Sequence, residues 1–125
     1  MTASIIYVAS PYSGPEPEMQ DRYQKAMLAT LYLSEIPDYQ AFVPISPIVH
    51  WHQIAKENNL RTDEEYYWRM NKLLIQQSAL VMVVLLEGWK SSVGVAKEIG
   101  YAEALNIPVK RQSLSLLAKR AATHD

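Results

Sequence analysis

The amino-acid sequence predicts an α/β domain built on a single doubly wound parallel sheet with helices on both faces. Short runs rich in valine and isoleucine alternate with longer segments in which apolar residues recur at helical spacing, and this alternation is typical of parallel α/β sheets. The run at residues 79–86 is almost wholly apolar, as expected of a strand that is covered on both faces. The length of 125 residues fits one domain over residues 1–125.

The first half of the chain is expected to hold two strands and one long helix. Residues 5–9 are β-branched and apolar, which indicates a buried strand, and turn-forming residues make 10–15 a loop. Apolar residues at helical spacing predict a helix over about 17–35, which the following proline closes. A second strand is expected at 41–45, where a Ser-Pro pair ends it, and 48–59 is expected to be a loop with room for one helical turn.

The second half of the chain is expected to contain three helices and two strands. Thr62 or Asp63 can cap the first of these helices, because Glu65 lies three residues after Thr62 in the register of a capping box. The further expected elements are a strand at residues 79–86, a helix from Ser91 or Ser92 to about residue 105, a short strand at residues 107–109 and a terminal helix at residues 113–122.

Together these elements predict a three-layer α/β/α fold of the flavodoxin-like or Rossmann-like kind. Right-handed crossovers restrict the order of the strands to a few possibilities. In such folds, ligands bind beyond the carboxyl ends of the strands. Three segments that follow strands are therefore expected to form a site, namely residues 10–14, 46–52 and 87–98.

Composition and charge narrow the classes of partner. The formal net charge is −1 and the basic residues are scattered, so we expect a small-molecule ligand and neither a nucleic acid nor a membrane as partner. The absence of cysteine excludes disulfides, thiolate metal sites and a cysteine nucleophile. His50-Trp51-His52 lacks a nearby third ligand, so no metal is expected; the segment indicates an aromatic wall for a base, or ordinary packing. No cofactor is expected either.

No basic stretch precedes the first apolar run, and no cleavage-site pattern follows it, so a signal peptide is not expected. The longest apolar run, residues 79–86, is far too short to span a bilayer. We therefore expect a cytoplasmic protein.

Glu98 is the most informative residue of the sequence. On a helical wheel it falls between Ala102 and Leu105 and close to Val95, on the face that is expected to pack on the sheet. A carboxylate there loses its hydration, and an unpaired buried charge is costly, so the position marks a candidate functional residue. The alternative is that Glu98 lies at the edge of the apolar stripe and reaches solvent.

Two loops add candidate binding groups. Residues 88–94 follow a buried strand and open a helix, where backbone N–H groups and the hydroxyls of Ser91 and Ser92 are suited to a phosphate or a ribose hydroxyl, with Gly94 allowing close approach. An ordinary serine cap beside a flexible glycine is the alternative. Ser10, Tyr12 and Ser13 end the first strand, where their hydroxyls are expected to point into the cleft, although Ser-Pro turns are common.

Taken together, these segments resemble the nucleoside 2-deoxyribosyltransferase superfamily, including its nucleotide N-glycosidase members and small bacterial and phage relatives. The resemblance spans roughly residues 5–109 and rests on four pieces. Its most specific part is the S-x-G-x-x-x-E-x-G-x-A pattern that begins at Ser92. The matching pieces are Tyr7-Val8-Ala9-Ser10-Pro11-Tyr12-Ser13, Phe42-Val43-Pro44-Ile45-Ser46-Pro47-Ile48, residues 68–74, and Gly88-Trp89 followed by residues 92–102.

The resemblance implies that Glu98 attacks C1′ of a sugar, that the base leaves, and that water or a second base resolves the glycosyl ester. Tyr7, Ser10 and Tyr12 would then position Glu98 or contact the sugar. Ser92 would bind a 5′-phosphate, because members that act on free nucleosides tend to carry aspartate there. The other residues expected to contact the substrate are Ser13, Ser46, Ile48, Gly88, Trp89 and Gly94.

One departure from the family pattern concerns catalysis. Asn71 stands where many members carry an aspartate that donates a proton or contacts the base, and an amide is not an acid. A nucleotide-binding module of the same fold without catalysis is therefore the second hypothesis, and a flavodoxin-like FMN domain is the third. The aromatic residues near one helix also predict a homo-oligomer; they are Trp51, Tyr66, Tyr67 and Trp68.

Overall fold

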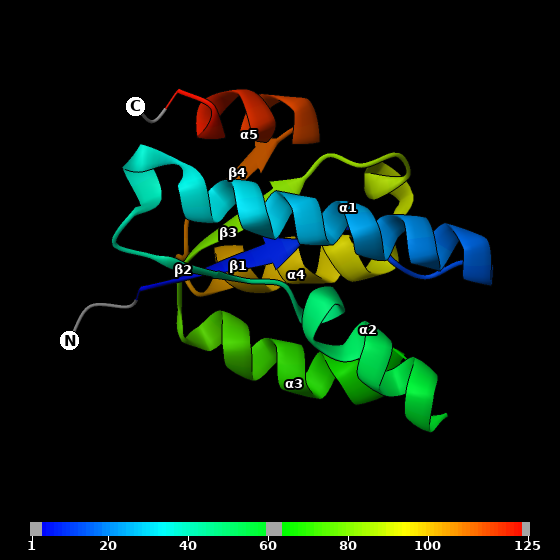
Figure 1. Cartoon of the computed structure of the whole chain (residues 1–125). Coiled ribbons are helices and arrows are strands. Elements are labelled where there is room, and N and C mark those ends of the chain that lie inside the picture. Colours follow the sequence, from blue (N-terminus) through cyan, green and yellow to red (C-terminus); the bar gives the residue numbers. More distant parts are fainter. Residues whose placement is uncertain (1–3, 60–63, 124–125) are drawn as a thin grey trace.

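The computed structural model describes residues 4–59 and 64–123, and the side chain of Glu64 is not among the parts described. Within them, four parallel strands lie in the order β2-β1-β3-β4 (Figure 1). The strands are β1 (Ile5–Ala9), β2 (Val43–Ile45), β3 (Ser78–Val84) and β4 (Val109–Gln112). Because the chain adds β2 on one side of β1 and β3 on the other, the sheet is doubly wound, and its order reverses between β1 and β3. The prediction of a parallel three-layer α/β fold is confirmed.

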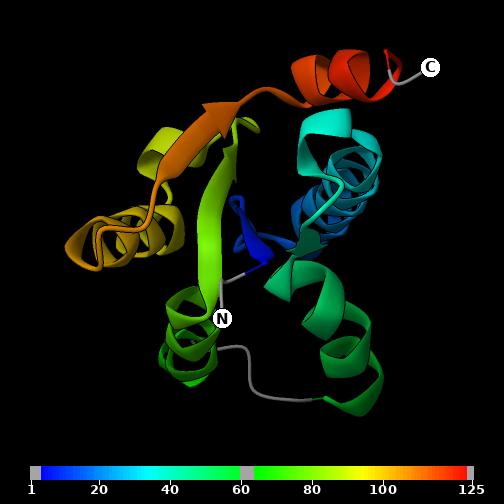
Figure 2. The same ribbon diagram turned by 90° about the vertical axis from the view of Figure 1, so that its left-hand side faces the viewer.

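Helices cover both faces of this sheet. Figure 2 shows α1 and α5 on one face and α3 and α4 on the other. The helical segments are α1 (Glu16–Glu35), η1 (Pro37–Tyr39), α2 (Pro47–Asn58), α3 (Glu64–Gln76), η2 (Trp89–Ser91), α4 (Val93–Ala104) and α5 (Leu114–Ala121). No helix in the described ranges is both long enough and apolar enough to cross a membrane.

The alternation of side chains along β1 and β3 divides the core in two. Ile6 and Val8 of β1 pack with Leu33 of α1 and Leu117 of α5 in one cluster. Tyr7 of β1 belongs to the opposite cluster, which includes Val95 and Ala102 of α4 and Ile75 of α3. Successive residues of a strand point to opposite faces, so the position of Tyr7 in the strand directs its ring toward α4.

The segment after β2 differs from the expected loop, since residues 47–58 form the helix α2. Ser46 caps it, with its Oγ accepting a hydrogen bond from the N–H of Val49 at 3.2 Å, and Pro47 occupies a first-turn position that needs no donor. The helix ends at Asn58, and the residue that follows, Asn59, has a left-handed φ of 49°. The sequence does not predict this helix, because the segment contains several aromatic and imidazole side chains and its apolar residues form only a weak stripe at helical spacing.

Other boundaries shift by a few residues. The last strand was expected at 107–109 but lies at Val109–Gln112, where Lys110 and Arg111 are exposed at the edge of the sheet. Strand β2 begins at Val43 rather than at residue 41. Ser92, one of the two residues expected to cap this helix, is the cap of α4. The expected cap at Thr62 or Asp63 lies outside the described residues.

Candidate active site

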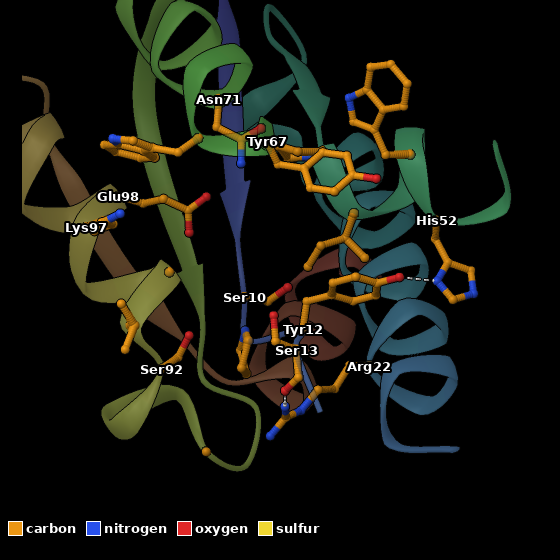
Figure 3. Close-up of a pocket in the computed structure, with 18 of the residues that line it drawn as sticks. Ser10, Tyr12, Ser13, Arg22, His52, Tyr67, Asn71, Ser92, Lys97 and Glu98 are labelled. Atoms are coloured by element: carbon orange, nitrogen blue, oxygen red, sulfur yellow. Dashed lines mark hydrogen bonds between the residues drawn. The ribbon is translucent and has the colours of Figure 1, made fainter. Parts of the chain in front are cut away.

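A pocket of about 510 Å³ opens beyond the carboxyl ends of β1 and β3 (Figure 3). The loops after these two strands, together with α1, α2, α3 and α4, supply its walls. Its position is the point where the strand order reverses, which is where open parallel sheets bind ligands. The volume falls within the range of small-molecule sites.

Glu98 and Tyr7 form a buried pair at this pocket. Glu98 comes from α4, is 8% exposed and lines the pocket, while Tyr7 comes from β1 and is fully buried beneath it. The hydroxyl of Tyr7 donates a hydrogen bond to Oε2 of Glu98. The expectation that Glu98 packs on the sheet side of its helix therefore agrees with its position, and a solvent-exposed Glu98 does not.

Burial raises the pKa of Glu98 to about 8, and the hydrogen bond from Tyr7 acts in the opposite direction, lowering it. Burial, and after it the neighbouring carboxylate, raise the pKa of Tyr7 well above its usual value of 10. Tyr7 thus remains a donor at all physiological pH values. The carboxyl group of Glu98 changes its charge near neutrality, which is the property expected of a functional acid or nucleophile.

Most of the residues expected from the sequence meet in this pocket. Those that line it are Ser10, Tyr12, Ser13, Ile48, Asn71, Gly88, Ser92, Gly94 and Glu98. Two expected contacts do not line it. Ser46 is buried as the cap of α2, and Trp89 packs against the core on the α3 and α4 face. Neither residue therefore lies where the sequence predicts, on the wall of this pocket.

The loop after β3 brings the start of α4 to the pocket. Gly88 has a φ of 91°, which side chains rarely adopt, and a Cβ there would lie 2.6 Å from Nη2 of Arg22. The Oγ of Ser92 accepts a hydrogen bond from the N–H of Val95 at 3.2 Å, so Ser92 is a helix cap. Its own hydroxyl proton is still available to a ligand. Val93 and Gly94 also line the pocket, and the helix itself offers no acceptor for their N–H groups.

Arg22 is a pocket residue that no motif in the sequence indicates. Its guanidinium donates to the carbonyl oxygen of Ser13 at 2.8 Å and to that of Glu87 at 3.3 Å, and it forms an ion pair with Glu18 at 2.7 Å. The side chain is only 14% exposed. Arg22 therefore ties together the loops after β1 and β3 and places a positive charge beside Gly88. Only its spacing of one helical turn from Glu18 is visible in the sequence.

His52 is a second residue whose role the sequence did not reveal. It is 6% exposed and stacks on the ring of Tyr23 at 4.1 Å between ring centres. Its Nδ1 lies 2.5 Å from the hydroxyl of Tyr12, and its Nε2 lies 3.0 Å from Oε1 of Gln20. Burial, and after it the nearby Lys56, lower the pKa of His52, so the ring is neutral at pH 7.

Ser10 is an unsatisfied polar group in the wall of the pocket. It follows β1 directly and is 6% exposed, and its Oγ has no hydrogen-bond partner among residues 4–59 and 64–123. Buried hydroxyls of this kind are uncommon because their desolvation is not repaid. Within residues 4–59 and 64–123, no three His, Asp or Glu side chains lie close enough together to hold a metal ion.

Comparison with known proteins places the chain in a family. No curated protein matches the sequence. A family model described as a domain of unknown function, DUF1937, matches residues 4–113. The match includes the strands, the loops and every pocket residue named above. Because it covers most of the 125 residues, the chain belongs to the DUF1937 family.

Proposed function

We propose that the protein cleaves or exchanges the N-glycosidic bond of a nucleotide or nucleoside, with Glu98 as the nucleophile and a preference for 5′-monophosphates. The observation that carries this proposal is the buried carboxyl group of Glu98, which lines the pocket and accepts a hydrogen bond from Tyr7. A carboxylate nucleophile needs this combination of access to a ligand and a partner that fixes its orientation. The resemblance to nucleoside 2-deoxyribosyltransferases supports the same chemistry.

In the proposed reaction, an ionised oxygen of Glu98 attacks C1′ of the sugar. A bond forms between C1′ and this oxygen while the bond from C1′ to the base nitrogen breaks, and its electron pair leaves with the base. The base takes up one proton from solvent in becoming the free base. Water then displaces Glu98 from C1′ in hydrolysis, or a second base does so in exchange. The incoming group releases one proton to solvent, and the carboxylate of Glu98 is restored.

Two features support Glu98 in this role. The fixed hydroxyl of Tyr7 stabilises the ionised carboxylate and holds one of its oxygens. The surroundings exclude much of the water that would otherwise compete with a substrate for the carboxylate. Asn71 lines the pocket but cannot act as the acid that protonates the leaving base.

The start of α4 is the proposed site of the 5′-phosphate. The N–H groups of Val93 and Gly94, the hydroxyl of Ser92 and the helix dipole all favour an anion there. Arg22 lines the same pocket together with its ion-pair partner Glu18, so the guanidinium offers N–H donors near Gly88 while Glu18 offsets its charge. All of these groups line the pocket at which the loops after β1 and β3 meet.

Changing Ser92 to aspartate tests this phosphate site. Ser92→Asp would place a negative charge against the phosphate, so monophosphate binding is expected to fall sharply while binding of the free nucleoside changes little or improves. Ser92→Ala removes a hydrogen bond to a charged group, worth about 1.5–3 kcal/mol, and it also removes the cap of α4. Aspartate caps helices as well as serine does, so a mere loss of capping cannot produce this pattern. Calorimetry with a nucleoside and its monophosphate measures it, and equal monophosphate affinity in wild type and Ser92→Asp would refute the phosphate site.

The second candidate function is nucleotide binding without catalysis. Asn71 favours it, because no acid stands at that position, and so does the high pKa of Glu98, which leaves most of the carboxyl groups protonated at pH 7. Incubation with a panel of nucleotides and nucleosides, followed by chromatography for free base, separates the two functions. Release of base supports the enzyme, whereas binding with no release at any pH up to 9 supports the module.

We also propose that the chain forms a homo-oligomer. The rings of Trp51, Tyr66 and Tyr67 lie close together at α2 and α3, with 6.0 Å between the ring centres of Trp51 and Tyr67, and each of the three is only partly buried. Apolar surface of this kind is often covered by a second subunit. Sedimentation at micromolar concentration is expected to give a species larger than the 14.2 kDa chain, and a monomer alone would contradict this.

A further inference from the structure

The far side of the pocket from Glu98 is where a base would lie in the proposed reaction. A nucleophile and its leaving group occupy opposite faces of C1′, so the base must extend away from Glu98. Figure 3 shows Glu98 on one side of the pocket and Tyr12 and Tyr67 across from it, with His52 on the side of Tyr12 that is remote from Glu98. The hydroxyl of Tyr12 is therefore placed to meet the edge of the base that is remote from the glycosidic bond.

A chain of hydrogen bonds fixes the direction of that hydroxyl. A neutral imidazole has one nitrogen that donates and one that accepts. Oε1 of Gln20 lies 3.0 Å from Nε2 of His52 and can only accept, so Nε2 carries the proton. Nδ1 is then the acceptor, and the hydroxyl of Tyr12, 2.5 Å away, donates to it. The stacking of His52 on Tyr23 holds the ring in this position.

The chain of Gln20, His52 and Tyr12 consequently determines what Tyr12 can offer to a ligand. Its single hydroxyl proton is directed at His52, so only oxygen lone pairs remain for the ligand. The burial of His52, which keeps the ring uncharged, prevents both nitrogens from donating at once. Reversal would require the amide of Gln20 to turn and the imidazole proton to move from one nitrogen to the other.

We propose that these three hydrogen-bonded residues make the site selective for bases that carry an amino group, rather than an oxo group, at the edge remote from the sugar. Cytosine and adenine present an amino donor there, at N4 and N6. Uracil and hypoxanthine present an oxygen acceptor, which would face the lone pairs of Tyr12 without a proton between them. This selectivity rests on the proposed function, because that function places the base opposite Glu98.

The test compares matched nucleotides that differ at this position. The ligands are cytidine against uridine 5′-monophosphate and adenosine against inosine 5′-monophosphate, each also in the 2′-deoxy form. Calorimetric titration in the Glu98→Gln background measures binding without consuming the ligand. The amino member of each pair that fits the pocket is expected to bind at least about tenfold more tightly, because an unpaired polar contact is strongly rejected.

Three variants separate the hydrogen-bond direction from a merely structural effect. Tyr12→Phe removes the hydroxyl, and Gln20→Met removes the acceptor that holds the proton on Nε2. In both, the affinity ratio of amino to oxo ligand is expected to fall close to one. Tyr23→Phe is the matched control, since it also removes one hydroxyl but keeps the stack on His52, and its ratio is expected to equal that of the parent.

A structural disturbance of the pocket would weaken both members of a pair together and leave their ratio unchanged. Equal binding of amino and oxo ligands by the parent protein, or an unchanged ratio in Tyr12→Phe, would overturn the proposed selectivity while leaving the glycosidic function intact. If none of these ligands binds, the proposed function itself fails, and this selectivity fails with it.

Discussion

Replacing Glu98 with glutamine is expected to abolish the release of free base while nucleotides still bind. Glutamine has the shape of the protonated carboxyl group and can accept the hydrogen bond from Tyr7, but its amide oxygen is a poor nucleophile. When catalytic residues act together, removing the nucleophile lowers kcat by at least about 10³-fold. Chromatography of the free base gives the rate, and calorimetry gives the affinity of the same variant.

A glutamate on the same helix serves as the control. Glu103 lies on α4 and is exposed, so Glu103→Gln removes the same negative charge without touching the pocket. Its rate of base release is expected to match that of wild type. If Glu98→Gln releases base at more than a tenth of the wild-type rate, Glu98 is not the nucleophile.

The pH dependence of the rate follows from the pKa of Glu98. Only the ionised carboxylate attacks, and with a pKa of about 8 about a tenth of the free protein is active at pH 7. The value of kcat/KM is therefore expected to rise through pH 7 and 8 and then level off. In Tyr7→Phe the carboxylate of Glu98 loses its hydrogen-bond donor, so the pKa of Glu98 rises further. The rise of kcat/KM is therefore expected to shift to higher pH. A flat profile between pH 6 and 9 would contradict this role for Glu98.

The sequence was sufficient for the fold because its strongest signals are those of burial. The apolar run that forms β3 is covered on both faces, with Val81, Met82 and Val83 fully buried. Such runs can be recognised in a sequence without tertiary information. The helix α2 was missed because its cap and its proline also fit a loop, and because His52 reads as polar although it is buried. The last strand was misplaced because its residues Lys110 and Arg111 are exposed.

The candidate site divides in the same way. Glu98 was found because helical spacing sets its face, and spacing is a local property of the sequence. Arg22 and Glu87 are 65 positions apart, and Tyr12 and His52 are 40 positions apart. Contacts across such separations depend on the packing of α1 and α2 at the carboxyl ends of the strands. No local pattern in a single sequence specifies such contacts. Only the structure therefore reveals the contacts of Arg22 and the hydrogen bonds that link Gln20, His52 and Tyr12.

The buried carboxyl group of Glu98 should also make the protein less stable as the pH rises. In the unfolded chain this group ionises near 4.5, whereas in the folded protein its pKa is about 8. Below 4.5 both states hold the proton and nothing is lost. Between 4.5 and 8 only the unfolded state releases it, so the free energy of unfolding falls with rising pH. Above 8 both states are ionised and the loss levels off.

The gap between 4.5 and about 8 corresponds to roughly 5 kcal/mol of stability. Glutamine does not ionise, so Glu98→Gln is expected to match wild type at pH 4 and to exceed it by several kcal/mol at pH 9. Chemical denaturation across this range measures the difference, and groups common to both proteins cancel from it. Glu103→Gln should follow the wild-type curve throughout, because that carboxylate is exposed in both states. If the curves of wild type and Glu98→Gln run parallel from pH 4 to 9, the carboxyl group is solvated in the folded protein, and the buried nucleophile on which the proposed reaction depends is absent.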